Sequence, residues 1–250
     1  MSKTPSLRID RLLANMGYGS RREIREMTKS RRVTLDGAPV DDGDAHVALV
    51  PDLPARLRVD GEPLDPLPGL IVMLHKPLGV TCSRKDAGRL VYDLLPERWS
   101  RREPAISTVG RLDKDTSGLL LMTDDGALLH RIISPKSHVA KRYRVDLARP
   151  LKGDETELFG AGGLLLESDD SPLLPAAFEP SSERSGFLTL HEGRYHQVRR
   201  MFAAIGNHVE ALHRDQIGTL SLPPDFVAGH WRVLQAADIA RIFAQATPSR

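Results

Sequence analysis

The chain of 250 residues contains a single cysteine, Cys82, so an internal disulfide bond is impossible. Chains without disulfides suit a reducing compartment, and we therefore expect a cytoplasmic protein. Long apolar runs are also missing: no stretch approaches the roughly 20 residues needed to span a bilayer, and the first ten residues, MSKTPSLRID, lack the apolar core of a signal peptide. We expect no association with a membrane. No coiled-coil pattern is present either, and this favours a monomer.

Signatures of nucleotide cofactors and of serine hydrolases are absent from the sequence. It has no GxxxxGK[ST], no GxGxxG and no GxSxG pattern. Four of the nine histidines fall between positions 191 and 213, but their spacing is not that of a zinc site and no cysteine pair accompanies them. We therefore expect neither a metal ion nor a cofactor. Cys82 is interpreted as a small residue beside a strand rather than a nucleophile, and Ser117 has no evident base.

Positive charge is concentrated at one end of the chain. The formal net charge is only +2, yet residues 1–40 hold nine Lys/Arg and four Asp/Glu, a local net charge of +5. The rest of the chain is therefore net acidic. A local excess of this kind predicts a small basic module attached to a larger body.

The basic module has the signals of two helices and a hairpin. Apolar residues at positions 9, 12, 13 and 16 follow the spacing of one helix face. Ser20 and Glu23 form a capping box that opens a second helix, on which Arg21, Arg25 and Lys29 make one basic stripe. The stretch RRVTLDGAPV then predicts two short strands joined by an Asp-Gly turn. The stripe is either a solvated helix face or a surface for nucleic acid, and the further charges at Arg31 and Arg32 favour the second.

The stretch RIDRLLANMGYGSRREIREMTKSRRVTLDG resembles an S4-type RNA-binding domain, although Arg31 stands where that family usually has glycine. The resemblance implies that the basic residues of this module contact RNA: Arg8, Arg21, Arg22, Arg25, Lys29 and Arg32. The stretch DGEPLDPLPG, residues 60–69, is rich in proline and glycine and is typical of a linker. We predict an S4-like domain over residues 1–60, a linker over 61–69 and a second domain over 70–250.

In the second block strands outnumber helices and do not alternate regularly with them. Strands are predicted in LIVMLHKP, ISTVGRLD, GLLLMTDDG, KRYRVDL, GFLTLHEG, HVEALHR and IGTLSL, and helices in ALLHRIIS and YHQVRRMFAAIGN. This pattern indicates an α+β fold with a mostly antiparallel sheet rather than a doubly wound one.

Three residues of this block combine reactive side chains with neighbouring apolar elements: Asp113, Tyr143 and Arg199. Each has an ordinary structural interpretation. The Asp-x-x-Thr/Ser-Gly pattern that starts at Asp113 is good turn chemistry through Gly118, and Tyr143 suits a packed position in a strand. An arginine near Asp113 would keep that carboxylate ionised and oriented. Spacing alone leaves catalysis and turn formation both open.

Four stretches of the second block resemble pseudouridine synthases of the RsuA/RluA type. They are VGRLDKDTSGLLLMTDDG, IVMLHKPLGVTCS (with His75 where asparagine is usual), KRYRVDL, and EGRYHQVRRMFAAIGNHVEALHRDQIGTLSL. Tyr-His-Gln in the last one is similar to the RsuA branch, which modifies 16S ribosomal RNA, whereas relatives that act on the large subunit usually have Asn-Arg-Gln. With the S4-like module, the resemblance extends from residue 6 to about residue 243.

The resemblance implies a role for each candidate residue. Asp113 is the nucleophile that attacks the target uridine, at ribose C1′ or at the base, and Arg199 pairs with it. Tyr143 stacks on the uracil and takes the ribose proton in a glycal route. Arg111 fills the space left by the flipped base, and Lys76 and Arg214 contact phosphate. The reaction is an isomerisation, so it needs no added group.

The implied substrate is the uridine at position 516 of bacterial 16S ribosomal RNA, within a partly assembled small subunit. Two other hypotheses stay open. One is the same chemistry on 23S ribosomal RNA. The other, from a different class, is a non-catalytic RNA-binding factor in ribosome assembly, which the S4-like block alone would support.

Overall fold

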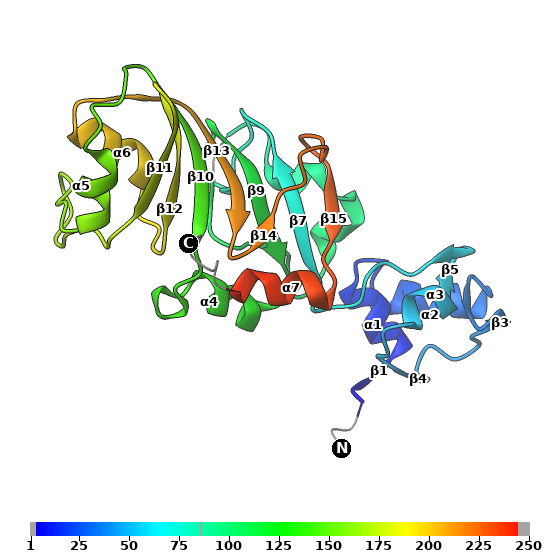
Figure 1. Ribbon diagram of the computed structural model, residues 1–250. Helices are drawn as coiled ribbons and strands as arrows, with labels where there is room; N and C mark the ends of the chain where they lie inside the picture. The colour runs from blue at the N-terminus through cyan, green and yellow to red at the C-terminus, as the bar shows by residue number, and fades with distance from the viewer. Residues whose placement is uncertain (1–3, 86, 245–250) are drawn as a thin grey trace. The chain divides into compact units, whose positions relative to one another are not determined.

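The computed structural model describes residues 4–85 and 87–244 and confirms the α+β class. Contacts within the chain divide it into two compact units. The first comprises the residues up to 71 together with segments 95–107 and 122–126, and the second comprises 72–94, 108–121 and the residues from 127 onward. Figure 1 labels the α-helices and most strands of both. The two units are defined by contacts and do not test whether residues 1–60 and 70–250 fold as separate domains. The predicted domain bounds therefore stay a prediction.

The first unit contains short strands and helices. Its elements are β1 (Ser6–Arg8), α1 (Ile9–Asn15), α2 (Arg21–Lys29), β2 (Val33–Leu35), β3 (Ala38–Pro39), β4 (His46–Ala48), α3 (Leu53–Arg56), β5 (Leu57–Val59), β6 (Glu62–Pro63) and the 3₁₀ helix η2 (Glu97–Arg101). The strands form a pair, β1–β4, and a four-stranded sheet in the order β3-β2-β5-β6.

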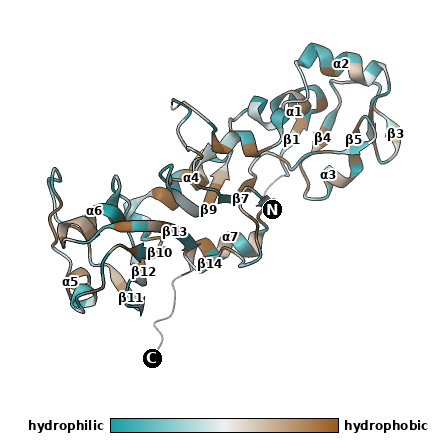
Figure 2. Cartoon of the chain, turned by 90° about the horizontal axis from the view of Figure 1, so that it is seen from above, coloured by the Kyte–Doolittle hydropathy of each residue, from teal (hydrophilic) through white to brown (hydrophobic). Residues whose placement is uncertain are grey.

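The predicted local signals of α1 and α2 are confirmed. The apolar face of α1 is buried at Ile9, Leu12, Leu13 and Met16. Ser20 caps α2 by accepting from the Glu23 amide, while the Glu23 side chain accepts from the Ser20 amide. Figure 2 shows α2 mainly in the colours of hydrophilic residues, because only one face of this short helix packs inward.

The turn after α2 explains why a glycine would suit position 31. Arg31 has φ = 55°, in the left-handed region where a Cβ atom is unfavourable. The hairpin that follows is confirmed: Asp36 and Gly37 both have positive φ, as a tight two-residue turn between β2 and β3 requires.

Segment 60–69 begins inside the sheet of the first unit. Asp60 and Gly61 form the turn between β5 and β6, and Leu64 is buried in the same apolar core as α1 and α2. Asp65 receives two hydrogen bonds from Arg98. The first half of the stretch predicted as a linker is therefore ordered by strand pairing, burial and an ion pair.

A buried ion pair connects the later segments of the first unit. Arg102 and Asp124 have side chains that are 1% exposed, with 3.0 Å between Nη2 and Oδ2. The other carboxylate oxygen, Oδ1, accepts a hydrogen bond from the Gly69 amide. Arg102 also donates to the Pro66 carbonyl. One carboxylate thus holds segments 66–69 and 95–107 against residue 124.

The second unit is built on a single sheet. Its elements are β7 (Ile71–Lys76), η1 (Val91–Leu94), β8 (Ser107–Thr108), β9 (Thr116–Thr123), α4 (Gly126–Ile133), η3 (Pro135–Ser137), β10 (Lys141–Leu147), α5 (Glu155–Ala161), β11 (Ala177–Ser182), β12 (Ser185–Leu190), α6 (Gln197–Ala204), β13 (Val209–Ile217), β14 (Leu220–Ser221), β15 (Trp231–Val233) and α7 (Ala236–Phe243). The strand order is β11-β12-β10-β13-β9-β7-β15. Strands β9 and β13 pair in parallel, whereas β10, β11, β12 and β14 pair antiparallel with their neighbours.

Helices α5 and α6 cover the β11–β12 end of this sheet (Figure 1). Three phenylalanines form the centre of that core, Phe159 of α5, Phe178 of β11 and Phe202 of α6, with ring centroids 5.2–6.0 Å apart in edge-to-face pairs. The strand predicted in KRYRVDL is confirmed as β10, and its side chains alternate, with Val145 and Leu147 buried in the same core.

Four local predictions differ from the structure. Residues Thr116–Gly118 are not a turn but the start of β9. Helix α6 begins at Gln197, so Tyr195 and His196 precede it. HVEALHR and the first residues of IGTLSL form one long strand, β13. In ISTVGRLD, pairing is limited to the two residues of β8, and the part from Val109 to Asp113 is loop. Among the described residues, no helix has the length and apolar character needed to cross a membrane.

The buried pair yields a stability prediction. Asp124→Asn keeps the size of the side chain but leaves the Arg102 guanidinium buried without a counter-charge, so we expect the free energy of unfolding to fall by about 3–5 kcal/mol. Chemical denaturation followed by circular dichroism measures this loss. The matched control is Asp36→Asn, which removes an exposed carboxylate paired with Arg56 and should change stability little. Equal losses in the two variants would contradict the argument.

Candidate active site

A cavity of about 440 Å³ opens on the second unit beside Asp113 and is called the Asp113 pocket below. Strand residues from the middle of the sheet line one side of it. The rest comes from loop 109–113, the end of α4 and segment 190–198. Its side chains from the sheet are Thr116, Lys141, Tyr143, Leu212, Arg214 and Ile217.

Asp113 lies in the loop just before β9 and is about one-third exposed, with a side-chain exposure of 32%. Its backbone carbonyl accepts from the Thr116 amide, so the loop closes tightly onto the strand. Its Oδ1 atom lies 3.3 Å from Nε2 of His196. The carboxylate is therefore reachable from the pocket while its backbone is fixed by the sheet.

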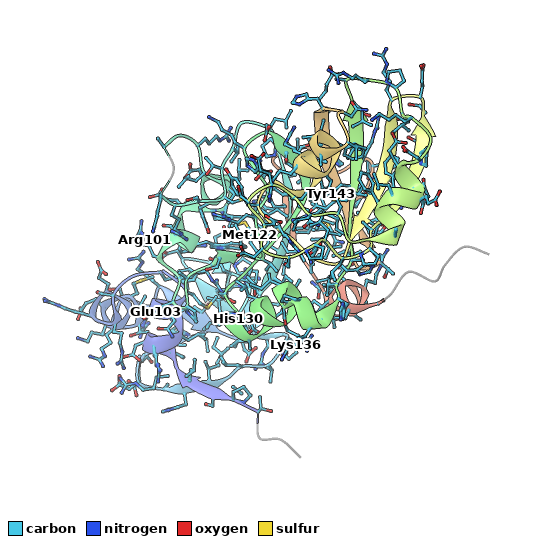
Figure 3. The ribbon with its side chains drawn as sticks, turned by 90° about the vertical axis from the view of Figure 1, so that its left-hand side faces the viewer. Arg101, Glu103, Met122, His130, Lys136 and Tyr143 are labelled. Atoms are coloured by element: carbon cyan, nitrogen blue, oxygen red, sulfur yellow. The ribbon has the colours of Figure 1, made fainter. Side chains whose placement is uncertain are left out.

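Tyr143 and Arg214 meet on neighbouring strands. Figure 3 labels Tyr143, which comes from β10 and is paired in register with Arg214 of β13. An Arg214 nitrogen, Nη1, lies 3.4 Å from the Tyr143 hydroxyl, and Nε donates to the Leu119 carbonyl at 2.8 Å. Arg214 is only 3% exposed, and its Nη2 atom has no hydrogen-bond partner in the part of the chain that is described. A buried donor without a partner is costly, and Arg214 is one of the residues that line the pocket.

Gly118 permits this strand pairing. It has φ = 113°, and a Cβ atom there would lie 2.2 Å from the Arg214 carbonyl oxygen. The glycine that turn chemistry explained from sequence is thus required for the close approach of β9 and β13, which brings Arg214 beside the Asp113 loop.

Lys141 is a pocket residue that the sequence did not reveal. Burial, followed by the charge of Arg214, lowers the pKa of Lys141 to about 8. Its partners across the sheet, Leu190 and Ile217, are apolar. The only signal in the sequence was its place two residues before Tyr143, on the same face of the strand.

The predicted pairing of Arg199 with Asp113 is wrong for this structure. Arg199 instead binds Asp115, donating to the backbone carbonyl and approaching the carboxylate, each at 3.0 Å. It also donates to the Val209 carbonyl at 2.8 Å. Because α6 begins at Gln197, Arg199 faces the far end of the loop rather than the pocket.

The prediction that Lys76 contacts phosphate is also wrong, because its side chain is fully buried. Its ammonium group donates to the carbonyls of Thr116 at 2.8 Å and Pro77 at 3.1 Å. Burial lowers the pKa of Lys76, while the nearby Cys82 and Asp113 oppose that change. Lys76 thus holds the backbone at the start of β9 and cannot reach RNA.

Other candidates lie as follows. Arg111 is exposed and lines the Asp113 pocket, so it can reach RNA.

Burial raises the pKa of Cys82, which keeps the thiol protonated and agrees with its interpretation as a packing residue. Ser117 does have a neighbouring base, since its Oγ lies 2.9 Å from Nδ1 of His213. Burial, followed by the charge of His75, lowers the pKa of His213. Ser117 and His213 are each adjacent in their strands to residues that line the pocket, but they do not line it themselves.

In the first unit, two arginines of the basic stripe, Arg21 and Arg25, surround one buried carboxylate together with Arg8. Asp10 is fully buried and lies within 3.1 Å of guanidinium nitrogens of Arg8, Arg21 and Arg25. Burial disfavours the ionised carboxylate, but the hydrogen bonds from Arg8 and Arg21 outweigh it and hold the pKa of Asp10 below its ordinary value. These three arginines are 31–49% exposed, so they are fixed in place with donors still facing solvent.

The remaining predicted RNA contacts of this unit differ in their surroundings. Lys29 pairs with Glu26, and Arg32 forms two hydrogen bonds with Asp60. Arg22 is exposed and has no recorded ion pair or hydrogen bond among the described residues. Arg22 is therefore the candidate whose charge is least compensated by its neighbours.

Comparisons with known proteins agree with both units. The family model described as RNA pseudouridylate synthase matches residues 70–171, and the S4 domain model matches residues 7–48. The uncharacterized RNA pseudouridine synthase YtzG of Bacillus subtilis is 40% identical over 243 residues, which cover 93% of this chain and 97% of that protein. The ribosomal small subunit pseudouridine synthase A of Escherichia coli is 40% identical over 240 residues, covering 94% and 100%.

A solved structure shows the same similarity. A crystal structure of a pseudouridylate synthase is 34% identical, covers 94% of this chain and 99% of its own, and superposes with a TM-score of 0.66. Since relatives above 30% identity span almost the whole sequence, the chain belongs to the RNA pseudouridine synthase family, in its form with an N-terminal S4 domain.

Proposed function

We propose that this protein isomerises a uridine of 16S ribosomal RNA to pseudouridine, with Asp113 as the nucleophile. The observation that carries the proposal is the Asp113 pocket, which combines a reachable carboxylate, the aromatic ring of Tyr143 and the unpartnered Arg214 Nη2 atom. Its volume of about 440 Å³ is sufficient for one nucleoside. The names of the curated relatives from Escherichia coli and Yersinia pestis support the small subunit as the source of the RNA.

The proposed reaction begins with base flipping. The target uridine leaves its stack, at a cost of a few kcal/mol, and enters the pocket. There the Tyr143 ring packs against the uracil, and Arg214 Nη2 donates to one of its carbonyl oxygens. Exposed Arg111, at the rim, is placed to fill the space left in the RNA. These contacts offset the cost of unstacking.

Covalent capture by Asp113 then allows the base to turn. A carboxylate oxygen of Asp113 attacks ribose C1′, and the glycosidic bond to N1 breaks with its electron pair leaving on uracil. The uracil rotates, C5 forms a bond to C1′, and the ester to Asp113 is broken. C5 loses its proton and N1 gains one, so the atoms and charges of substrate and product balance without a redox step.

The setting of the reaction is part of the proposal. Arg22, together with Arg8, Arg21 and Arg25 around Asp10, would bind phosphates of the same RNA within a partly assembled small subunit in the cytoplasm, with one copy of the protein per particle. The match of the S4 domain model to residues 7–48 supports this assignment.

The first prediction removes the proposed nucleophile. Asp113→Asn should lower the rate of pseudouridine formation by at least about a thousandfold, because the amide cannot form the ester. Site-specific mapping of pseudouridine in 16S and 23S RNA, from cells that express only the variant, measures the effect. The control is Asp146→Asn, which changes an exposed carboxylate on β10, the strand that also carries Tyr143, and should leave the modification intact.

The outcomes separate the hypotheses. Loss of the uridine modification at position 516 of 16S RNA in the Asp113→Asn variant supports the proposal. Loss of a site in 23S RNA instead would move the substrate to the large subunit. An unchanged modification pattern in both RNAs would favour a non-catalytic assembly factor.

The second prediction concerns the first unit. Arg22→Gln should weaken RNA binding and make the slope of log affinity against log salt less negative by about 0.7–0.9, the change for one phosphate contact. Filter binding between 50 and 200 mM salt is the measurement. Arg56→Gln, whose guanidinium is paired with Asp36, serves as the control and should keep the original slope. Identical slopes for Arg22→Gln and the unaltered protein would show that Arg22 makes no phosphate contact.

A further inference from the structure

Segment 190–198 places two aromatic rings in a stack at the wall of the Asp113 pocket. The rings of Tyr195 and His196 have centroids 3.9 Å apart and planes inclined by 16°. Nε2 of His196 in turn lies 3.3 Å from Oδ1 of Asp113. Side-chain contacts therefore run without interruption from the Asp113 carboxylate to the surface of the protein.

Tyr195 is 70% exposed, more than any other large apolar or aromatic side chain among the described residues. Because His196 covers one face of its ring, the exposed area is largely the opposite face and the edge. Tyr195 thus contributes little to the apolar core. Its ring presents a flat aromatic surface to solvent at the mouth of the pocket.

The backbone of this segment is held in an unfavourable conformation. His196 has φ = 48°, in the left-handed region, which costs free energy for a residue with a Cβ atom. Hydrogen bonds maintain it: the Arg200 side chain donates to the Tyr195 carbonyl, and the Arg194 amide donates to Oε1 of Gln197. These contacts therefore hold the backbone from which both rings project.

We infer that the outer face of Tyr195 binds, by stacking, a nucleobase adjacent to the target uridine in the RNA strand. The inference rests on the proposed function and assigns to Tyr195 a role in positioning the RNA strand. When the target base flips out, its neighbour loses a stacking partner. Unstacked bases are held by aromatic side chains in single-strand recognition, and every base offers a π-face for this contact.

The geometry favours a base over the phosphate or sugar as the group bound here. The open surface of Tyr195 is uncharged and planar, whereas the exposed cation of the pocket, Arg111, comes from the separate loop 109–113. A base on Tyr195 would extend the stack to three layers, with His196 in the middle and its Nε2 edge beside Asp113. Stacking would then help to position the strand relative to the nucleophile.

The test is a double-mutant cycle between the protein and its RNA. Steady-state rates are measured for the unaltered protein and Tyr195→Ala, on 16S RNA assembled from synthetic pieces and on versions with an abasic residue directly 5′ or directly 3′ of the target. Tyr195→Ala should raise KM by roughly 5- to 150-fold, the effect of losing one stacked base. An abasic residue at the stacked position should raise KM for the unaltered protein by a similar factor. When Tyr195→Ala acts on that abasic RNA, KM should be little higher than with either change alone.

Tyr195→Phe and Tyr195→Trp should keep a low KM because both retain an aromatic face. The control is Val227→Ala, which trims another exposed apolar side chain outside the pocket lining and should not change KM. Thermal unfolding checks that Tyr195→Ala remains folded, as its exposure leads us to expect.

Independent effects of Tyr195→Ala and of both abasic residues would overturn the inference, as would an unchanged KM for Tyr195→Ala. A rise in KM that no abasic residue reproduces would mean that Tyr195 contacts something other than a neighbouring base. Failure of the proposed function has a different signature: the unaltered protein would form no pseudouridine on the intact RNA. In that case, filter binding measures the affinities of the unaltered protein and of Tyr195→Ala for the intact and the abasic RNAs. These affinities take the place of KM in the same cycle.

Discussion

The site depends on three cations that bind backbone carbonyls around one loop. Lys76 from β7 donates to Thr116, Arg199 from α6 donates to Asp115, and Arg214 from β13 donates to Leu119. Charged donors make stronger hydrogen bonds than neutral ones, and all three are wholly or mostly shielded from water. The carbonyls they bind follow Asp113 in the chain. The loop is therefore fixed from three elements of the unit while the Asp113 carboxylate itself remains open to the pocket.

This arrangement explains which features of the site could be predicted from the sequence. Local patterns predicted the buried strand of Leu119–Met122 and marked Asp113 and Tyr143 as candidates, because these features are encoded within a few residues. Arg111 was indicated only by the family resemblance. The partners of Lys76 and Arg199 could not be predicted, since they depend on where β7 and α6 meet the loop in three dimensions. A basic residue beside a reactive carboxylate looks like an ion pair in the sequence, yet here both cations bind carbonyl oxygens next to it.

In the fold, too, features set by residues close together in the sequence were predictable, whereas features set by contacts between distant residues were not. Helix caps, the Asp36–Gly37 turn and the alternation of β10 were predictable because they depend on neighbours in the chain. The parallel pairing of β9 with β13 was not, although it is the reason that Gly118 has φ = 113° next to the Arg214 carbonyl. Similarly, the Arg102–Asp124 pair recruits segment 95–107 into the first unit, and no local pattern marks either residue as buried.

The electrostatics of the arginines around Asp10 differ from those of the Asp113 pocket. Around Asp10, three arginines share a buried carboxylate, which fixes their guanidinium groups before RNA binds and so reduces the entropy lost on binding. In the Asp113 pocket, Lys141 has apolar strand partners, and neither Lys141 nor Arg214 is paired with a carboxylate among the described residues. Their mutual repulsion contributes to the low pKa of Lys141. Oxygen acceptors on a ligand that enters would relieve that repulsion. The arginines around Asp10 are thus neutralised in part by the carboxylate that they surround, whereas the pocket gains most from a ligand that brings oxygen acceptors with it.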